Sequence, residues 1–127
     1  LLGYIIFSVV CGFVISIVFQ MAHVVDETAF PLPDESTRKL PQDWTIHQLA
    51  TTANFSTRSK IIFWLTGGLN FQVEHHLFPA ISHIHYPEIS KIVKEVCSQF
   101  NIGYIEYPNL ATVMRAHVSY LRTTGIN

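Results

Sequence analysis

The chain begins with the run LLGYIIFSVVCGFVISIVF, residues 1–19, which contains no charged side chain. A helix of this length rises about 28 Å, close to the hydrocarbon thickness of a bilayer. A signal peptide would need an initiator Met, a basic segment and a small-residue cleavage site, and the run has none of these. A buried helix of a soluble core is the remaining alternative. We therefore expect a transmembrane helix over residues 1–22.

The chain starts inside this apolar run and without a Met. We therefore expect the C-terminal piece of a longer, multi-pass integral membrane protein. All eight Lys and Arg residues follow the run, the first being Arg38. Because positive charge tends to stay on the inner side of a membrane, this distribution predicts a cytosolic C-terminal region.

The composition of the 127 residues excludes several classes of function. Hydrophobic residues make up 49% and charged residues 13%, and the formal net charge is −1. No basic stretch is present to follow a phosphate backbone, so nucleic acid is excluded as a partner, whereas membrane lipid is expected. The two cysteines predict no disulfide framework. Seven histidines with so little charge favour a membrane protein with a metal site.

Residues 23–60 are expected to form a cytosolic loop or linker region. Three prolines and several acidic residues break the apolar pattern there. Asp43 can cap a short helix, whereas Thr51, Thr52 and Asn54 favour turns.

Residues 61–127 are expected to form a C-terminal helical region that also carries the histidine pair, as part of a single domain. The run IIFWLTGGLNF, residues 61–71, is too short to span a bilayer and predicts an interfacial or buried helix. Trp44 and Trp64 suit the headgroup level of a membrane. The segment PEISKIVKEVCSQF, which begins at Pro87, predicts an amphipathic helix. Its apolar stripe consists of Ile89, Ile92, Val93, Val96 and Phe100.

The end of the chain predicts one more helix. NIG, residues 101–103, ends the amphipathic helix, and YIEYP, residues 104–108, is a short extended segment. Asn109 can cap a final helix, whose apolar stripe is Leu110, Val113, Met114, His117, Val118 and Leu121. The expected fold class is mostly α, with one transmembrane helix followed by a cytosolic helical region.

The most distinctive segment is GGLNFQVEHHLFP, residues 67–79. On a helix, Gln72, His75 and His76 share one face, because their spacing is i, i+3, i+4. Imidazole is a ligand for iron, zinc and copper. Glu74 lies off that face, and it could bind a histidine ring nitrogen from behind. The alternative is that both histidines are packed polar residues at a bilayer interface.

His23 is the third candidate ligand, because it ends the apolar run where a side chain can face a polar cavity between helices. A plain interfacial histidine is the alternative. His83 and His85 favour a surface or substrate-contact role, while His47 and His117 are expected to pack or to form hydrogen bonds. No nucleophile elbow or glycine-rich phosphate loop is present, so no catalytic or cofactor-binding side chain is predicted apart from the metal ligands.

The segment FQVEHHLFP resembles the third histidine box of the membrane fatty acid desaturases in its glutamine form, Q-x-x-H-H. That form is typical of the front-end subgroup, which inserts a double bond between an existing one and the carboxyl end. MAHVVDETAFP, DWTIHQLATTANFS and SHIHYPEISKIVKE extend the likeness to bacterial acyl-CoA desaturases of the linoleoyl type. The resemblance covers most of the chain after the apolar run.

The resemblance implies a mostly helical membrane protein with a cytosolic cap over a di-iron centre. By position, His75 and His76 match the two ligands of the third box, Gln72 fills its first place, and His23 matches an additional histidine of some relatives. Asn70 is not assigned to iron. The first two boxes are missing and are expected upstream, so this piece alone should be inactive.

The resemblance further implies two iron ions, O2 as co-substrate, an acyl-CoA or lipid-linked acyl substrate, and an electron donor such as ferredoxin or a small haem protein. Three alternatives stay open: a related di-iron lipid hydroxylase or ketolase, a zinc site, and a non-catalytic membrane scaffold. The aromatic side chains near the box are expected to wall an acyl tunnel, or else to face lipid or the core; they are Phe63, Trp64, Phe71 and Phe78.

Overall fold

The computed structural model describes residues 1–40 and 43–125. In chain order the elements are α1 (Leu2–His23), α2 (Trp44–Thr51), β1 (Ala53–Phe55), α3 (Lys60–Leu65), α4 (Gln72–Leu77), the 3-10 turn η1 (His83–His85), α5 (Tyr86–Gln99), β2 (Ile105–Tyr107) and α6 (Leu110–Thr124). The described part of the chain is therefore mostly helical. This confirms the expected fold class of one long apolar helix followed by shorter ones.

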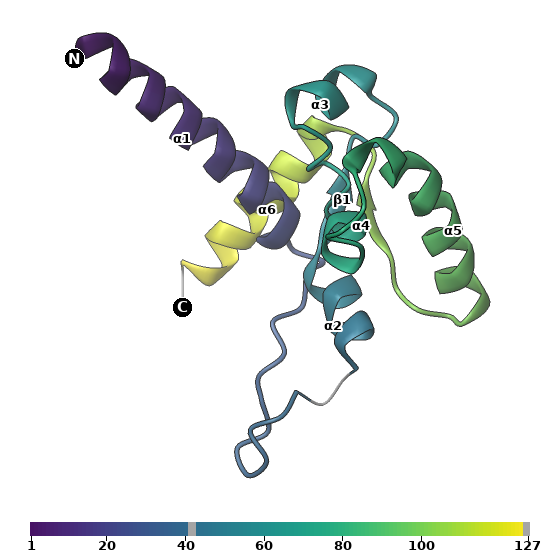
Figure 1. The fold of residues 1–127 in the computed structure, drawn as a ribbon. Helices are drawn as coiled ribbons and strands as arrows, with labels where there is room; N and C mark the ends of the chain where they lie inside the picture. Colours follow the sequence, from purple (N-terminus) through teal and green to yellow (C-terminus); the bar gives the residue numbers. More distant parts are fainter. Residues whose placement is uncertain (41–42, 126–127) are drawn as a thin grey trace.

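α1 projects away from the other elements, with its N-terminus at a free end (Figure 1). Within the described residues it is the one helix long and apolar enough to cross a membrane, and only 6% of its most apolar 18-residue window is buried. Its contacts with the rest of the protein lie near its C-terminal end, at Val18, Met21 and Ala22. A helix that is apolar all round and largely uncovered is typical of a membrane span, which agrees with the transmembrane helix expected over residues 1–22.

A two-stranded parallel sheet joins distant parts of the chain. Ala53 pairs with Ile105, and Phe55 pairs with Tyr107. The sheet packs between the end of α1 and α6, so that the first hydrophobic core contains residues from all three: Val18, Met21, Ala22, Val25, Ala53, Phe55, Tyr107, Val113 and Ala116. This core fixes the C-terminal end of α1, and with it His23, against β1.

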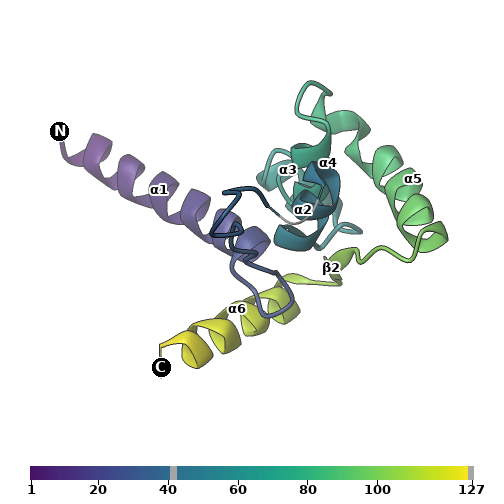
Figure 2. The ribbon, with the colours of Figure 1, turned by 90° about the horizontal axis from the view of Figure 1, so that it is seen from below.

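The second hydrophobic core joins α2, α4 and α5, which Figure 2 shows on the far side of the molecule from the N-terminus of α1. Leu49, Val73, Val93 and Cys97 form its centre. Because α4 packs against β1 as well as α5, it lies between the two cores. The histidine pair thus lies on a short helix that packs against α2, α5 and β1.

The bounds of α5 and α6 agree with those predicted from the sequence. Pro87 lies in the first turn of α5, Asn109 caps α6 through a capping box, and residues 105–107 form the expected extended segment. The buried face of α5 differs from the predicted stripe. Ile92, Val96 and Phe100 are exposed, whereas the face turned inward consists of Tyr86, Ser90, Val93 and Cys97.

The reason lies in what α5 packs against: Ser90 bonds to the Tyr104 hydroxyl, so a polar contact helps to set the rotation of the helix. The segment expected as a loop or linker, residues 23–60, also holds regular structure, namely α2 and β1. Asp43 stands at the N-cap of α2 but its side chain forms no capping bond. Asn54 lies fully buried in a strand rather than in a turn.

Candidate metal centre

The turn that leads into α4 depends on two glycines. Gly67 and Gly68 have φ values of 59° and 80°, in the left-handed region that glycine tolerates best. Gly68 also lies against η1, because a Cβ built on it would come within 2.7 Å of the Cβ of His83. A larger residue at this position would push the turn and η1 apart.

Two asparagine side chains then attach α4 to β1. The Asn54 amide oxygen accepts from the Val73 N–H at 2.8 Å, which caps one of the free N–H groups at the start of α4. The Asn70 amide donates to the carbonyls of Phe55 and Ser56 at 3.3 and 3.4 Å. Asn70 therefore has a structural role at the end of β1.

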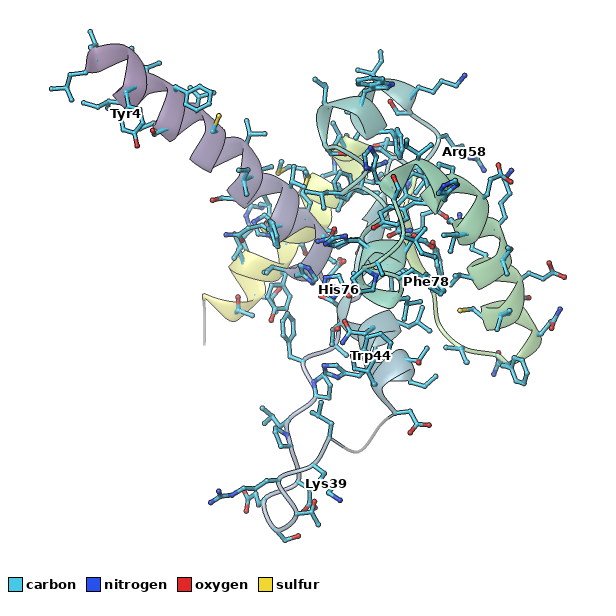
Figure 3. The ribbon with its side chains drawn as sticks, viewed as in Figure 1. Tyr4, Lys39, Trp44, Arg58, His76 and Phe78 are labelled. Atoms are coloured by element: carbon cyan, nitrogen blue, oxygen red, sulfur yellow. The ribbon has the colours of Figure 1, made fainter. Side chains whose placement is uncertain are left out.

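The structure brings all four candidate donors together. The rings of His75 and His76 lie edge to face, with centroids 5.8 Å apart, and the ring of His23 lies 4.9 Å from that of His76. Gln72 Nε2 is 3.3 Å from His23 Nε2. Figure 3 shows His76 next to the C-terminal end of α1. Residues 49 positions apart in the sequence thus meet at one place.

Each of the three histidines has a partner on its Nδ1 atom. His23 Nδ1 lies 3.2 Å from the carbonyl oxygen of Thr51, His76 Nδ1 lies 2.8 Å from Gln48 Oε1, and His75 Nδ1 lies 3.2 Å from the Tyr86 hydroxyl. A carbonyl oxygen only accepts, so His23 Nδ1 carries the proton. Its Nε2 is therefore unprotonated and accepts from the Gln72 amide. That is the tautomer that binds a metal through Nε2.

The electrostatics of the cluster favour the neutral imidazole. Burial, followed by the electrostatic influence of His23 and His75, lowers the pKa of His76 to about 4. His76 is therefore uncharged at neutral pH. Metal binding requires a deprotonated ring nitrogen, so this histidine needs no proton release at Nε2 before it can act as a ligand.

Gln72 contributes a buried oxygen with no partner. Its side chain is fully buried, and its Oε1 accepts no hydrogen bond from any described residue. An unsatisfied buried acceptor is costly unless a ligand, a water or an ion binds it. Three imidazole nitrogens and this oxygen fit a transition metal in their chemistry. Within residues 1–40 and 43–125, however, no group of three or more His, Cys, Asp or Glu side chains is arranged to hold an ion, so the donor set is partial.

Glu74 does not take the place predicted for it behind a histidine ring. Its carboxylate is fully buried, and it accepts from the Asn54 amide at 2.6 Å and from the Tyr104 hydroxyl at 2.8 Å. Burial raises the pKa of Glu74, although the bonds from Asn54 and Tyr104 act in the opposite direction. The reason for the difference is directional: on α4 this side chain turns toward β1 and α5, away from the histidine face.

The remaining histidines are not members of this cluster. His117 Nδ1 binds the Val24 carbonyl at 2.6 Å, which confirms the expected hydrogen bond. The Nδ1 atom of His47 is buried and has no partner among the described residues. His83 packs 5.9 Å from the ring of Phe63, while His85 is exposed.

Comparison with known proteins places the chain in a family. The family model of the fatty acid desaturases matches residues 1–108. The chain belongs to the fatty acid desaturase family. It is 42% identical over 123 residues to an acyl-lipid (8-3)-desaturase of Physcomitrium patens, covering 97% of this chain and 25% of that protein.

Two further desaturases show the same relation. The chain is 41% identical over 114 residues to an sn-1 linoleoyl-lipid 6-desaturase of Synechocystis sp., covering 90% of this chain and 32% of that protein. It is 38% identical over 126 residues to Delta(5) fatty acid desaturase A of Dictyostelium discoideum, with 96% and 27% covered. The chain thus spans about a quarter to a third of the length of these desaturases. No solved structure gives a significant match.

The aromatic residues expected to wall a desaturase tunnel do not form one surface. Phe63, Trp64 and Phe71 line a pocket of about 390 Å³ together with Arg58 and Lys60. Phe78 packs instead against the second core, next to α5.

Membership of the desaturase family, predicted from the histidine box, is confirmed.

Sequence reasoning missed the residues that contact the histidines from outside the box. Gln48, Thr51 and Tyr86 bind the three Nδ1 atoms. Two of them lie 28 residues from their partner, and no spacing rule links side chains across such a distance. A signal was available in the segments DWTIHQLATTANFS and SHIHYPEISKIVKE, which carry the family resemblance and contain these three residues.

Proposed function

We propose that this chain is the third-histidine-box part of an O2-dependent, di-iron fatty acid desaturase of the front-end type. The observation that carries the proposal is the meeting of His23, Gln72, His75 and His76 at the junction of α1 and α4. Family membership and the desaturase names of the relatives support the same reading. This chain spans only a quarter to a third of the length of these relatives, so the proposed activity belongs to a whole protein that includes the other two boxes.

The reaction sets the requirements of the site. Converting two neighbouring CH2 groups into a double bond removes two hydrogen atoms, that is, two electrons and two protons. Reduction of O2 to two waters takes four electrons, so a separate donor, ferredoxin or a small haem protein, must supply the other two. When bound, iron would supply the O2-derived oxidant that unactivated C–H bonds require, because no acid or base side chain can remove such a proton.

The residues of this chain have three tasks in the proposed reaction. His23, His75 and His76 present Nε2 atoms as ligands, and Gln72 presents its unpaired Oε1 beside them. The apolar surroundings keep water from the oxidant. The pocket beside α3 lies next to Phe71, one residue before the box, where it can contribute to positioning an acyl chain. The acyl carrier is coenzyme A or a lipid, and the proposed location is an integral membrane protein with this region in the cytosol.

The test uses the full-length protein expressed in a host that supplies its acyl substrate. Fatty acids are analysed by gas chromatography and mass spectrometry for His75→Ala, His76→Ala and wild type. Gln99→Ala on α5 is the control, because that side chain is exposed and contacts none of the four cluster residues. Loss of the new double bond in both box variants at equal protein level, with activity kept in the control, is the expected result.

Other outcomes would identify a different function. Full activity in both box variants would leave a non-catalytic scaffold as the better reading. A hydroxyl or keto product in place of a double bond would indicate a related di-iron hydroxylase or ketolase. Elemental analysis of the purified protein separates the metals, because zinc without iron would contradict the proposal.

A further inference from the structure

α2 contacts two of the candidate ligands from one side. Gln48 Oε1 lies 2.8 Å from His76 Nδ1, and the Thr51 carbonyl lies 3.2 Å from His23 Nδ1. Gln48 and Thr51 are three positions apart, so they lie on neighbouring positions of one helix face. α2 is an eight-residue helix inside the segment that the sequence predicted as a linker.

The C-terminal end of a helix is suited to accept a hydrogen bond from a histidine Nδ1 atom. The last four carbonyls of a helix have no partner within it, and they carry the partial negative charge of the helix dipole. Thr51 is the last residue of α2, so its carbonyl is free to accept a proton-bearing nitrogen. The Ala50 carbonyl, in the same turn, accepts from the Ala29 N–H at 2.8 Å, which ties the segment after α1 to the same helix end.

We propose that α2 is the positioning element of the metal centre: Gln48 and the Thr51 carbonyl hold the Nδ1 protons of His76 and His23, so that both Nε2 atoms are unprotonated and can bind metal. This inference rests on the proposed function and adds residues to it. Neither residue touches the metal or the substrate. They are positioning residues that act through the two imidazole rings, and partners of this kind typically contribute 10- to 100-fold to metal affinity.

Packing makes the contact stable. Leu49 of α2 is buried in the second core with Val73 of α4, so the two helices cannot slide without opening that core. The separation of His76 and Gln48 is therefore fixed by Val73, about one helical turn before His76, and by Leu49, directly after Gln48. A histidine ring that is free to turn about χ2 would not keep its Nε2 atom directed to the same place as that of the other ring. It could also adopt the tautomer that carries the proton on Nε2.

The test measures iron retention by the purified full-length protein, with no assay of turnover. Gln48→Met keeps the length of the side chain and removes the acceptor. Gln48→Glu keeps an acceptor of nearly the same shape. Gln99→Met on the exposed part of α5 is the matched control. Each protein is loaded with Fe(II), treated with a chelator, and its remaining iron is measured by elemental analysis over time, alongside the thermal unfolding midpoint of the metal-free form.

The expected result is iron loss about 10- to 100-fold faster for Gln48→Met than for wild type. Gln48→Glu and Gln99→Met should retain iron as wild type does. Wild-type retention by Gln48→Met would overturn the inference and leave the proposed function intact. Equal loss from Gln48→Met and Gln48→Glu would also overturn it, because the acceptor would then have no role. A wild-type protein that takes up no iron would overturn both proposals.

Discussion

One buried carboxylate lies on the same short helix as the histidine pair. Glu74 turns away from the rings, and every hydrogen bond it accepts comes from the protein interior, from Asn54 and Tyr104. Tyr104 is itself bonded to Ser90 of α5. This network therefore links β1, α4 and α5 through one acid, and its value to the site is structural.

Tyr104→Phe is predicted to destabilise the protein by about 1–3 kcal/mol, because it removes a donor from a buried carboxylate and leaves Ser90 and Asn54 short of a partner. The measurement is the thermal unfolding midpoint of the detergent-solubilised full-length protein. Tyr4→Phe is the control, since Tyr4 is 73% exposed on α1. An unchanged midpoint in Tyr104→Phe would mean that the network does not stabilise the fold.

Gly68→Ala is predicted to destabilise the protein by about 2–4 kcal/mol. The new Cβ meets the Cβ of His83, and the left-handed backbone adds strain of its own. Gly67→Ala separates these two effects, because it has the strain but nothing within 4 Å of its Cβ. Its cost should be about 1–2 kcal/mol. Thermal unfolding should recover in part when His83→Gly is combined with Gly68→Ala, and no recovery would contradict the clash.

At the scale of elements, the sequence predicted what depends on local spacing. α1, α5 and α6 follow from an apolar run, a periodic pattern and the signals at Pro87 and Asn109. Local spacing could not predict β1, because Asn54 is polar and becomes a strand residue only when residues 105–107 pair beside it. The contacts of Gln48 were equally hidden, since its partner lies 28 residues away.

The direction in which a side chain of a short helix points could not be predicted from the sequence either. Gln72, His75 and His76 were predicted to share a face, and they meet as a cluster with His23. Glu74 was predicted to support that cluster. The rotation of a six-residue helix about its axis, however, depends on the elements that it packs against. The Asn54 and Tyr104 side chains offer two donors on the other side, and the carboxylate turns to them.

Asn109→Ala is predicted to loosen the first turn of α6. The Asn109 side chain accepts from the Thr112 N–H at 3.0 Å, and the Thr112 hydroxyl closes the capping box from the other direction. Loss of such a cap costs about 0.5–2 kcal/mol. Hydrogen exchange followed by mass spectrometry should become faster in residues 110–114, with no change in α5. Asn109→Asp, which keeps an acceptor, should exchange as wild type does, and faster exchange in it would contradict the capping role.

At the scale of the whole molecule, α3 and the loop that carries Lys39 lie at opposite ends. Figure 1 shows α3 at the top of the drawing, level with the N-terminal half of α1. Figure 3 places Lys39 at the opposite end, on the loop at the bottom. Three side chains of α3 are largely exposed, Ile61, Trp64 and Leu65. The length of this segment predicted an interfacial or a buried helix, and the exposure of these side chains favours the interfacial position.

Spin labels at positions 64 and 39 should report opposite surroundings in the full-length protein reconstituted in lipid. A label at position 64, in a cysteine-free background, should collide more with O2 than with a water-soluble nickel chelate. A label at position 39 should show the reverse. The collision rates are measured by power saturation in electron paramagnetic resonance. Equal access of the nickel chelate to both positions would place α3 outside the membrane interface.

The pairing of β1 with β2 has a consequence for synthesis on the ribosome. Residues 53–55 emerge first, the histidine pair follows, and residues 105–107 come last. Tyr104, which completes the partners of Glu74, emerges directly before β2. While the histidine pair leaves the exit tunnel, its supporting strand and its buried acid are both still incomplete. The order of translation thus delays the complete support of the histidine pair until β2 has followed it out of the tunnel.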